Sequence, residues 1–113
     1  MKSSLTPLVF AMATVLALAT SPAALAADAD AAQALAKKSD CMKCHSISAK
    51  KEGPSFKETA AKYKGKADAE QKLYVHLTTS PKIKVDGAQE EHSNLKTKNE
   101  ADVRNVVQWI LSQ

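Results

Sequence analysis

The chain has 113 residues, of which 44% are hydrophobic and 25% are charged, and its formal net charge is +4. This length fits one domain, and an ordinary charged fraction with a small net charge argues against wholesale disorder. No run of basic residues is long enough to suggest a nucleic-acid-binding arm. We therefore expect one folded, mildly basic domain that does not bind nucleic acid.

Residues 1–26 have the features of a signal peptide. Lys2 supplies a positive start, residues 8–19 are almost entirely apolar, and residues 24–26 (Ala-Leu-Ala) have the small–x–small form of a cleavage site. The apolar run is shorter than the ~20 residues needed to cross a bilayer, which disfavours an uncleaved membrane anchor. We expect export to the periplasm and a mature domain of residues 27–113 without stable membrane insertion.

The mature domain is poor in bulky apolar residues, because only 4% of the chain is aromatic. Domains of this size are marginal, and those without a large core usually need a disulfide, a metal or another covalent or bound staple. We therefore expect a bound group to complete the core.

Helical signals dominate the mature domain. A pattern that resembles a capping box, with Asp or Ser followed three residues later by Gln or Glu, occurs three times ahead of apolar residues at helical spacing. It predicts helices that begin near residues 30, 55 and 68. The three pairs are Asp30/Gln33, Ser55/Glu58 and Asp68/Gln71.

A fourth helix is predicted at the end of the chain. Asn99 is placed to cap it, and four apolar residues then recur at i, i+3, i+4 and i+7, which is the spacing of one buried helix face. Trp109 and Leu111 widen this face. The four residues are Val103, Val106, Val107 and Ile110.

Residues 78–98 show no regular periodicity and no strand pattern. They contain Ser80-Pro81 and Gly87, which favour turns. Irregular segments longer than ~12–15 residues in compact domains are usually functional or disordered. We therefore expect a long irregular loop here.

The strongest signal for function is Cys41-Met42-Lys43-Cys44-His45. Two cysteines three apart, followed at once by histidine, form the attachment motif of c-type haem. Each thiol forms a thioether with one haem vinyl group, and the adjacent histidine then lies under the iron as an axial ligand. The motif predicts one haem c, held covalently by Cys41 and Cys44 and bound to iron through His45.

Three other interpretations of these cysteines remain open. A disulfide between them is compatible with an oxidising compartment. A thioredoxin-like redox pair would require a βαβ pattern, which is not seen. A structural zinc site would need His76 and His92 as further ligands, but their separation does not have the H-x₃₋₅-H form.

Four segments together resemble the small bacterial class I cytochromes c, and the resemblance covers the whole mature domain. It implies an all-α fold of about four helices around one covalent haem c, with the first and last helices packed crosswise. It also implies that the carbonyl of Pro54 accepts the Nδ1–H of His45. The segments are the Ala-rich helix before the motif, the motif itself, residues 53–56 (GPSF) with 60–63 (AAKY), and residues 109–111 (WIL).

The sequence departs from the commoner family pattern at the second axial ligand. Most class I cytochromes c use a methionine from a loop before the last helix, but no methionine follows His45. His92 stands where the resemblance expects that ligand, and residues 89–94 (QEEHSN) resemble the distal loop of a bis-histidine branch. We therefore expect His45 and His92 as the metal ligands. His76, within the third predicted helix, and an iron without a second protein ligand remain the alternatives.

Bis-histidine ligation predicts a one-electron carrier. Both axial positions are filled, so no open site remains for a substrate, and we expect no enzymatic activity. An imidazole raises the reduction potential less than a thioether does. The alternative is a gas-binding or ligand-sensing haem protein, in which the distal histidine dissociates from the iron.

The resemblance also suggests a monomeric shuttle between larger redox proteins. Candidates include multihaem cytochromes, outer-membrane iron-oxidation systems, reductases and oxidases. Nine lysines gather around the attachment motif, and they either steer acidic partners towards the haem edge or form an ordinary solvated surface. They are Lys37, Lys38, Lys43, Lys50, Lys51, Lys57, Lys62, Lys64 and Lys66.

Overall fold

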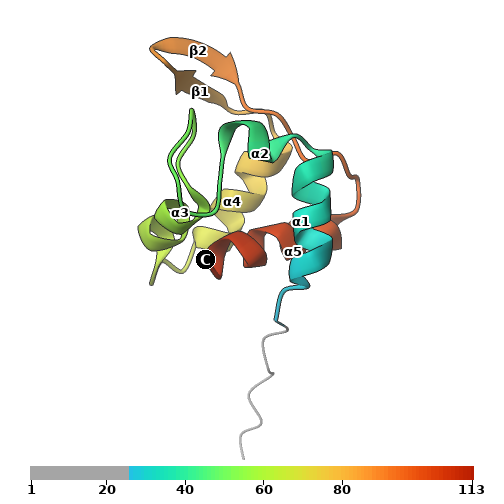
Figure 1. The fold of residues 1–113 in the computed structure, drawn as a ribbon. Helices are drawn as coiled ribbons and strands as arrows, with labels where there is room; N and C mark the ends of the chain where they lie inside the picture. Colours follow the sequence, from blue (N-terminus) through green and yellow to red (C-terminus); the bar gives the residue numbers. More distant parts are fainter. Residues whose placement is uncertain (1–25) are drawn as a thin grey trace, which may run out of the picture.

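The computed structural model describes residues 26–113, so the predicted signal peptide lies outside the described residues apart from Ala26. Within residues 26–113, no helix is both long enough and apolar enough to span a membrane. The described part contains five helices and one two-stranded sheet (Figure 1). In chain order they are α1 (Ala29–Lys38), α2 (Cys41–Cys44), α3 (Phe56–Tyr63), α4 (Ala69–Thr78), β1 (Lys82–Val85), β2 (Ala88–Glu91) and α5 (Glu100–Leu111).

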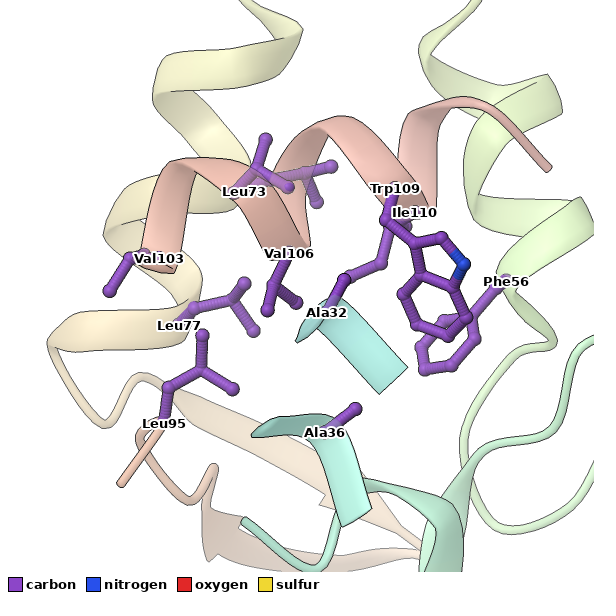
Figure 2. Packing of buried hydrophobic residues seen from close by; sticks show 11 residues of the cluster. Ala32, Ala36, Phe56, Leu73, Leu77, Leu95, Val103, Val106, Trp109 and Ile110 are labelled. Carbon is purple, nitrogen blue, oxygen red and sulfur yellow. The ribbon is translucent and has the colours of Figure 1, made fainter. Parts of the chain in front are cut away.

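The last helix, α5, organises the core. Helices α1, α3 and α4 each pack against it, and α1 crosses it at a steep angle (Figure 1). The apolar spacing predicted for this helix is confirmed, because Val106 and Val107 are almost completely buried. Figure 2 shows Trp109 of this helix beside Phe56, and Val106 in the part of the core where Leu77 and Leu95 also lie. The all-α class predicted from the resemblance is confirmed by this arrangement.

Helix α1 is fastened to α5 by a reciprocal pair of hydrogen bonds. The backbone N–H of Asp28 donates to Oδ1 of Asn105 (2.8 Å), and the Asn105 side-chain amide donates to the carbonyl of Asp28 (2.9 Å). The Asp28 carboxylate accepts from the backbone of Ala31 and caps the helix. The prediction of Asp30 as the cap was therefore wrong. Asp28 and Asp30 could each cap this helix, and the hydrogen bonds between Asp28 and Asn105 select Asp28.

The other predicted helix starts are confirmed in different degrees. Ser55 and Glu58 form the full capping box, and Asn99 accepts from the backbone of Ala101. Helix α4 does follow Asp68, but this side chain makes no capping hydrogen bond and forms an ion pair with Lys72 instead (2.8 Å).

The expectation of an irregular loop over residues 78–98 was wrong for its central part. Strands β1 and β2 form an antiparallel hairpin in which Lys82 lies opposite Glu91 and Val85 opposite Ala88. Asp86 and Gly87 connect them with φ angles of 49° and 85°. A two-residue turn with both residues at positive φ matches the twist of a hairpin, and Asp-Gly is a preferred sequence for it.

The attachment motif forms a short helix of its own, α2, so the fold has five helices where about four were expected. It follows Asp40, which adopts a left-handed conformation (φ 62°) and separates α2 from α1. A single helical turn is too short to show an apolar period, so periodicity does not reveal it.

Candidate haem site

The two cysteines lie at the ends of α2, and both are free thiols, so the disulfide interpretation finds no support in the structure. Burial raises the pKa of the Cys41 thiol. The Cys44 thiol donates to Oε2 of Glu52 (3.3 Å), and this hydrogen bond is the main cause of its raised pKa. Both thiols are therefore protonated near neutral pH, while one helical turn holds them side by side for attachment.

His45 follows α2 directly, in an extended backbone conformation. Its Nδ1 lies 2.7 Å from the carbonyl oxygen of Pro54. A carbonyl can only accept, so Nδ1 carries the proton and Nε2 is the nitrogen left free to bind a metal. The hydrogen bond expected from the family resemblance is present, and such a contact orients an imidazole ligand and raises its basicity.

Gly53 packs its backbone against the His45 ring. A Cβ added at this position would lie 2.5 Å from Cε1 of His45, so no residue with a side chain fits without displacing the ring. The backbone N–H of Gly53 also donates to the carbonyl of Cys44 (2.8 Å). The sequence analysis used Gly53 only as part of the GPSF segment, although a glycine directly before Pro54 was the available signal for this close packing.

Phe56 connects the site to the core. Its ring stacks on His45, with centroids 5.4 Å apart, and meets Trp109 of α5 edge-on at 5.2 Å. The capping box of α3 fixes Phe56, which is the first residue of that helix. The His45 ring is therefore held between the Gly53 backbone and a buried aromatic pair.

His92 comes directly after β2, and its backbone N–H donates to the carbonyl of Pro81 (2.8 Å), which continues the hairpin pairing. Its ring centre lies 6.2 Å from that of His45. A metal–imidazole bond is about 2.0–2.1 Å long and the nitrogen lies about 1.1 Å from its ring centre, so two opposed imidazoles on one ion have centres about 6.3 Å apart. The observed separation of the ring centres is close to this value.

The electrostatic surroundings of His92 favour the form that binds metal. Burial, followed by the nearby His76 and His45, lowers the pKa of His92 from 6.5 to about 4. It is therefore neutral at pH 7, as a metal ligand must be. Its Nδ1 is buried and has no hydrogen-bond partner within residues 26–113.

His76, the alternative distal ligand, lies on α4 beside His92. The two ring centres are 4.3 Å apart, with an angle of 52° between the ring planes. The pKa of His76 is lowered from 6.5, mainly by burial, so His76 is also neutral at pH 7.

The residues that the zinc interpretation required do not form a site. In the described part of the chain, no group of three or more His, Cys, Asp or Glu side chains is placed to hold a metal ion.

Comparison with known sequences identifies the family. Residues 29–113 match the sequence profile of the family described as Cytochrome c. Cytochrome c-552 of Hydrogenobacter thermophilus is 38% identical over 81 residues, which cover 69% of this chain and 76% of that protein. Cytochrome c-551 of Stutzerimonas stutzeri is 38% identical over 96 residues, which cover 85% of this chain and 86% of that protein.

Comparison with solved structures agrees. The class 1 cytochrome MtoD of Sideroxydans lithotrophicus superposes with a TM-score of 0.74 at 49% sequence identity, over 77% of this chain and 97% of that one. Cytochrome c552 of Nitrosomonas europaea superposes with a TM-score of 0.56 at 31% identity, over 71% of this chain and 96% of that one.

Proposed function

Because the chain belongs to the cytochrome c family, whose members bind a covalent haem c and carry electrons, we propose that it is a periplasmic one-electron carrier with His45 and His92 as its axial ligands. Its domain begins after a cleaved signal peptide of residues 1–26. The periplasm is the usual location of the bacterial class I cytochromes c it resembles.

The observation that carries this proposal is the 6.2 Å separation of the two imidazole ring centres. It supports one iron bound between them, and no methionine after His45 offers a competing thioether. The neutral state of His92 supports the same role, because a protonated imidazole cannot bind iron.

When bound, the haem supplies a ferric/ferrous couple, and the residues of this chain determine how that couple is used. Pro54 and Gly53 hold the His45 ring in one orientation and one tautomer. Two strong axial ligands leave no coordination position for a substrate, which favours electron transfer over an enzymatic reaction. Imidazole in place of thioether predicts a lower reduction potential than that of methionine-ligated relatives.

Exposed lysines support a transient encounter with acidic redox partners. All nine lysines named above are exposed, and Lys51 donates to the carbonyl of Met42 within α2 (2.8 Å). This contact places a positive charge beside the cysteines. Such charges accelerate the encounter more than they tighten the complex. A monomer docking in turn on larger cytochromes, reductases or oxidases fits this surface.

The test is the ultraviolet–visible spectrum of the holoprotein in its ferric and ferrous states, for the wild type, His92→Ala and His92→Met. We expect a low-spin wild type and a high-spin ferric His92→Ala variant. His92→Met is the matched control, because a thioether at this position should restore the low-spin state, add a sulfur-to-iron charge-transfer band and raise the reduction potential.

Carbon monoxide binding to the ferrous protein separates the carrier from the ligand-sensing alternative. Slow or absent binding by the wild type, with fast binding by His92→Ala, supports a carrier with a stable distal ligand. Fast binding by the wild type would show that His92 leaves the iron on reduction. An unchanged low-spin spectrum in His92→Ala would rule out His92 as the ligand.

A further inference from the structure

The two imidazoles proposed as axial ligands differ in what their second nitrogen contacts. Nδ1 of His45 donates to Pro54 at 2.7 Å. Nδ1 of His92 is shielded from water but has no hydrogen-bond partner within the described residues. A buried N–H without a partner costs about 1–3 kcal/mol, and metal-bound histidines almost always donate their other N–H to an acceptor. Nδ1 of His92 therefore lacks the kind of contact that Pro54 gives Nδ1 of His45.

His76 is the polar side chain placed to supply it. Its ring centre is 4.3 Å from that of His92. Since each nitrogen lies about 1.1 Å from its ring centre, rotation of the His76 ring brings a nitrogen within the ~2.7–3.2 Å of a hydrogen bond without moving the backbone. Rotation about χ2 is soft for an imidazole.

The backbones that carry the two rings are held in a fixed relation. His76 lies on α4 between Leu73 and Leu77, which are both buried in the core. The carbonyl of Leu77 accepts from the backbone of Leu95, just beyond His92. At the start of the hairpin, Ser80 N–H donates to the Asn94 side chain (2.7 Å). These contacts fasten the His92 segment to the end of α4.

We propose that His76 is a positioning residue for the distal ligand: a His76 ring nitrogen accepts the Nδ1–H of His92 and so turns Nε2 of His92 towards the iron. This inference rests on the proposed function, because it takes His92 as the ligand. It assigns His76 a role distinct from ligation. The contact makes His92 a stronger donor, which favours ferric iron and keeps His92 bound after reduction.

The experiment compares His76→Phe, which keeps a flat ring and removes the acceptor, with His76→Gln, which keeps an acceptor oxygen. Val75→Ala is the control on the same helix, because Val75 is exposed. Each holoprotein is examined for spin state, reduction potential and the rate of carbon monoxide binding to the ferrous form. These readouts respond to the ligand field and not merely to folding.

We expect His76→Phe to remain folded and largely low-spin, with a raised potential and faster carbon monoxide binding. Loss of such an outer contact typically weakens metal binding 10–100-fold. A tenfold loss confined to the ferric state corresponds to about 59 mV for one electron. His76→Gln should recover most of the wild-type potential, and Val75→Ala should match the wild type.

Three results would overturn the inference. His76→Phe with wild-type potential and carbon monoxide kinetics would show that the acceptor is not used. His76→Gln as impaired as His76→Phe would reduce the role to ring packing. A high-spin His76→Phe together with a low-spin His92→Ala would make His76 the ligand. The last result also overturns the proposed ligation, whereas the first two leave His92 in place.

Discussion

The two sides of the candidate haem site use the same ligand type but are built differently. On the proximal side, the segment from Cys41 to Phe56 surrounds His45 with a backbone carbonyl, a glycine backbone and a stacked ring. On the distal side, His92 follows a two-stranded hairpin whose second strand is exposed along its whole length. We call the segment from Cys41 to Phe56, which contacts the His45 ring, the proximal wall. We call the hairpin of β1 and β2, which precedes His92, the distal arm.

This difference indicates which of the two histidines can move away from the site more easily. An element with few buried contacts opens more easily than one packed into the core. Trp109 anchors the proximal side through Phe56, whereas Leu95, just after the hairpin, is the residue that joins the distal segment to the core cluster. Any exchange of axial ligand is therefore expected on the distal side.

Gly53→Ala should have the largest effect, because it adds a methyl group where the proximal wall packs against the His45 ring. The added Cβ would lie 2.5 Å from Cε1 of His45, so either the ring or the backbone must move. Overpacking of this kind costs about 1–3 kcal/mol. We expect a lower yield of holoprotein, a lower melting temperature and a mixed spin state, measured by absorbance spectra and thermal denaturation.

Gly65→Ala is the matched control for this prediction. Unlike Gly53, Gly65 has open space where a Cβ would be added, with no atom within 4 Å, but its φ is positive at 74°. It should lose stability from backbone strain alone and keep a wild-type spectrum. Equal spectral changes in Gly53→Ala and Gly65→Ala would contradict a specific role of Gly53 in holding the His45 ring.

Gly87→Ala should have the second largest effect and act on the distal arm. Gly87 has a φ of 85° and open space around it, so alanine adds about 1–2 kcal/mol of backbone strain in the turn. We expect carbon monoxide to bind the ferrous protein several-fold faster, with little change in the His45 environment. Gly87→Asn should bind carbon monoxide at close to the wild-type rate, because asparagine tolerates this backbone conformation. Equal rates in the wild type, Gly87→Ala and Gly87→Asn would show that the hairpin does not control His92.

Asp40→Asn should have the smallest effect. Lys96 and then Lys43 hold the pKa of Asp40 below its ordinary 3.8, and the contact with Lys96 (2.8 Å) ties the chain after the hairpin to the start of α2. Asparagine also accepts the left-handed backbone, so the substitution isolates the charge. A slightly lower melting temperature is expected at pH 7.

The difference in melting temperature between the wild type and Asp40→Asn should depend on pH, because the pKa of the Asp40 carboxylate is lowered in the folded protein. The unfolded chain holds the proton more tightly, so the stabilisation is complete above pH 3.8 and is lost as the pH falls through the lower folded pKa. Thermal denaturation of both proteins should therefore converge in strong acid. A constant difference across that range would show that the charge is not responsible.

Sequence patterns predicted the features that depend on neighbours along the chain. The capping box at Ser55 and the apolar face of α5 are local arrangements, and Cys41, Cys44 and His45 lie within five consecutive residues. The cap at Asp28 was missed because Asn105, far away in the sequence, selects it. A local pattern cannot distinguish it from Asp30.

The hairpin and the histidine pair show the opposite case. The strands have only four residues each, β2 has no buried face, and the Asp86-Gly87 turn was the one clear signal. The contact between His76 and His92 arises because α4 and the end of β2 meet in space. Nothing in their spacing predicts it, and the roles of His92 and Pro54 as site residues stay predictions.

The pairing of α1 with α5 brings the two ends of the domain together, because Asp28 and Asn105 are hydrogen-bonded although they are 77 positions apart in the sequence. In a chain that grows from its N-terminus, Cys41 and Cys44 are made long before α5 exists. The attachment motif is therefore complete along the chain well before the α1–α5 pairing, which needs both ends of the domain, can form.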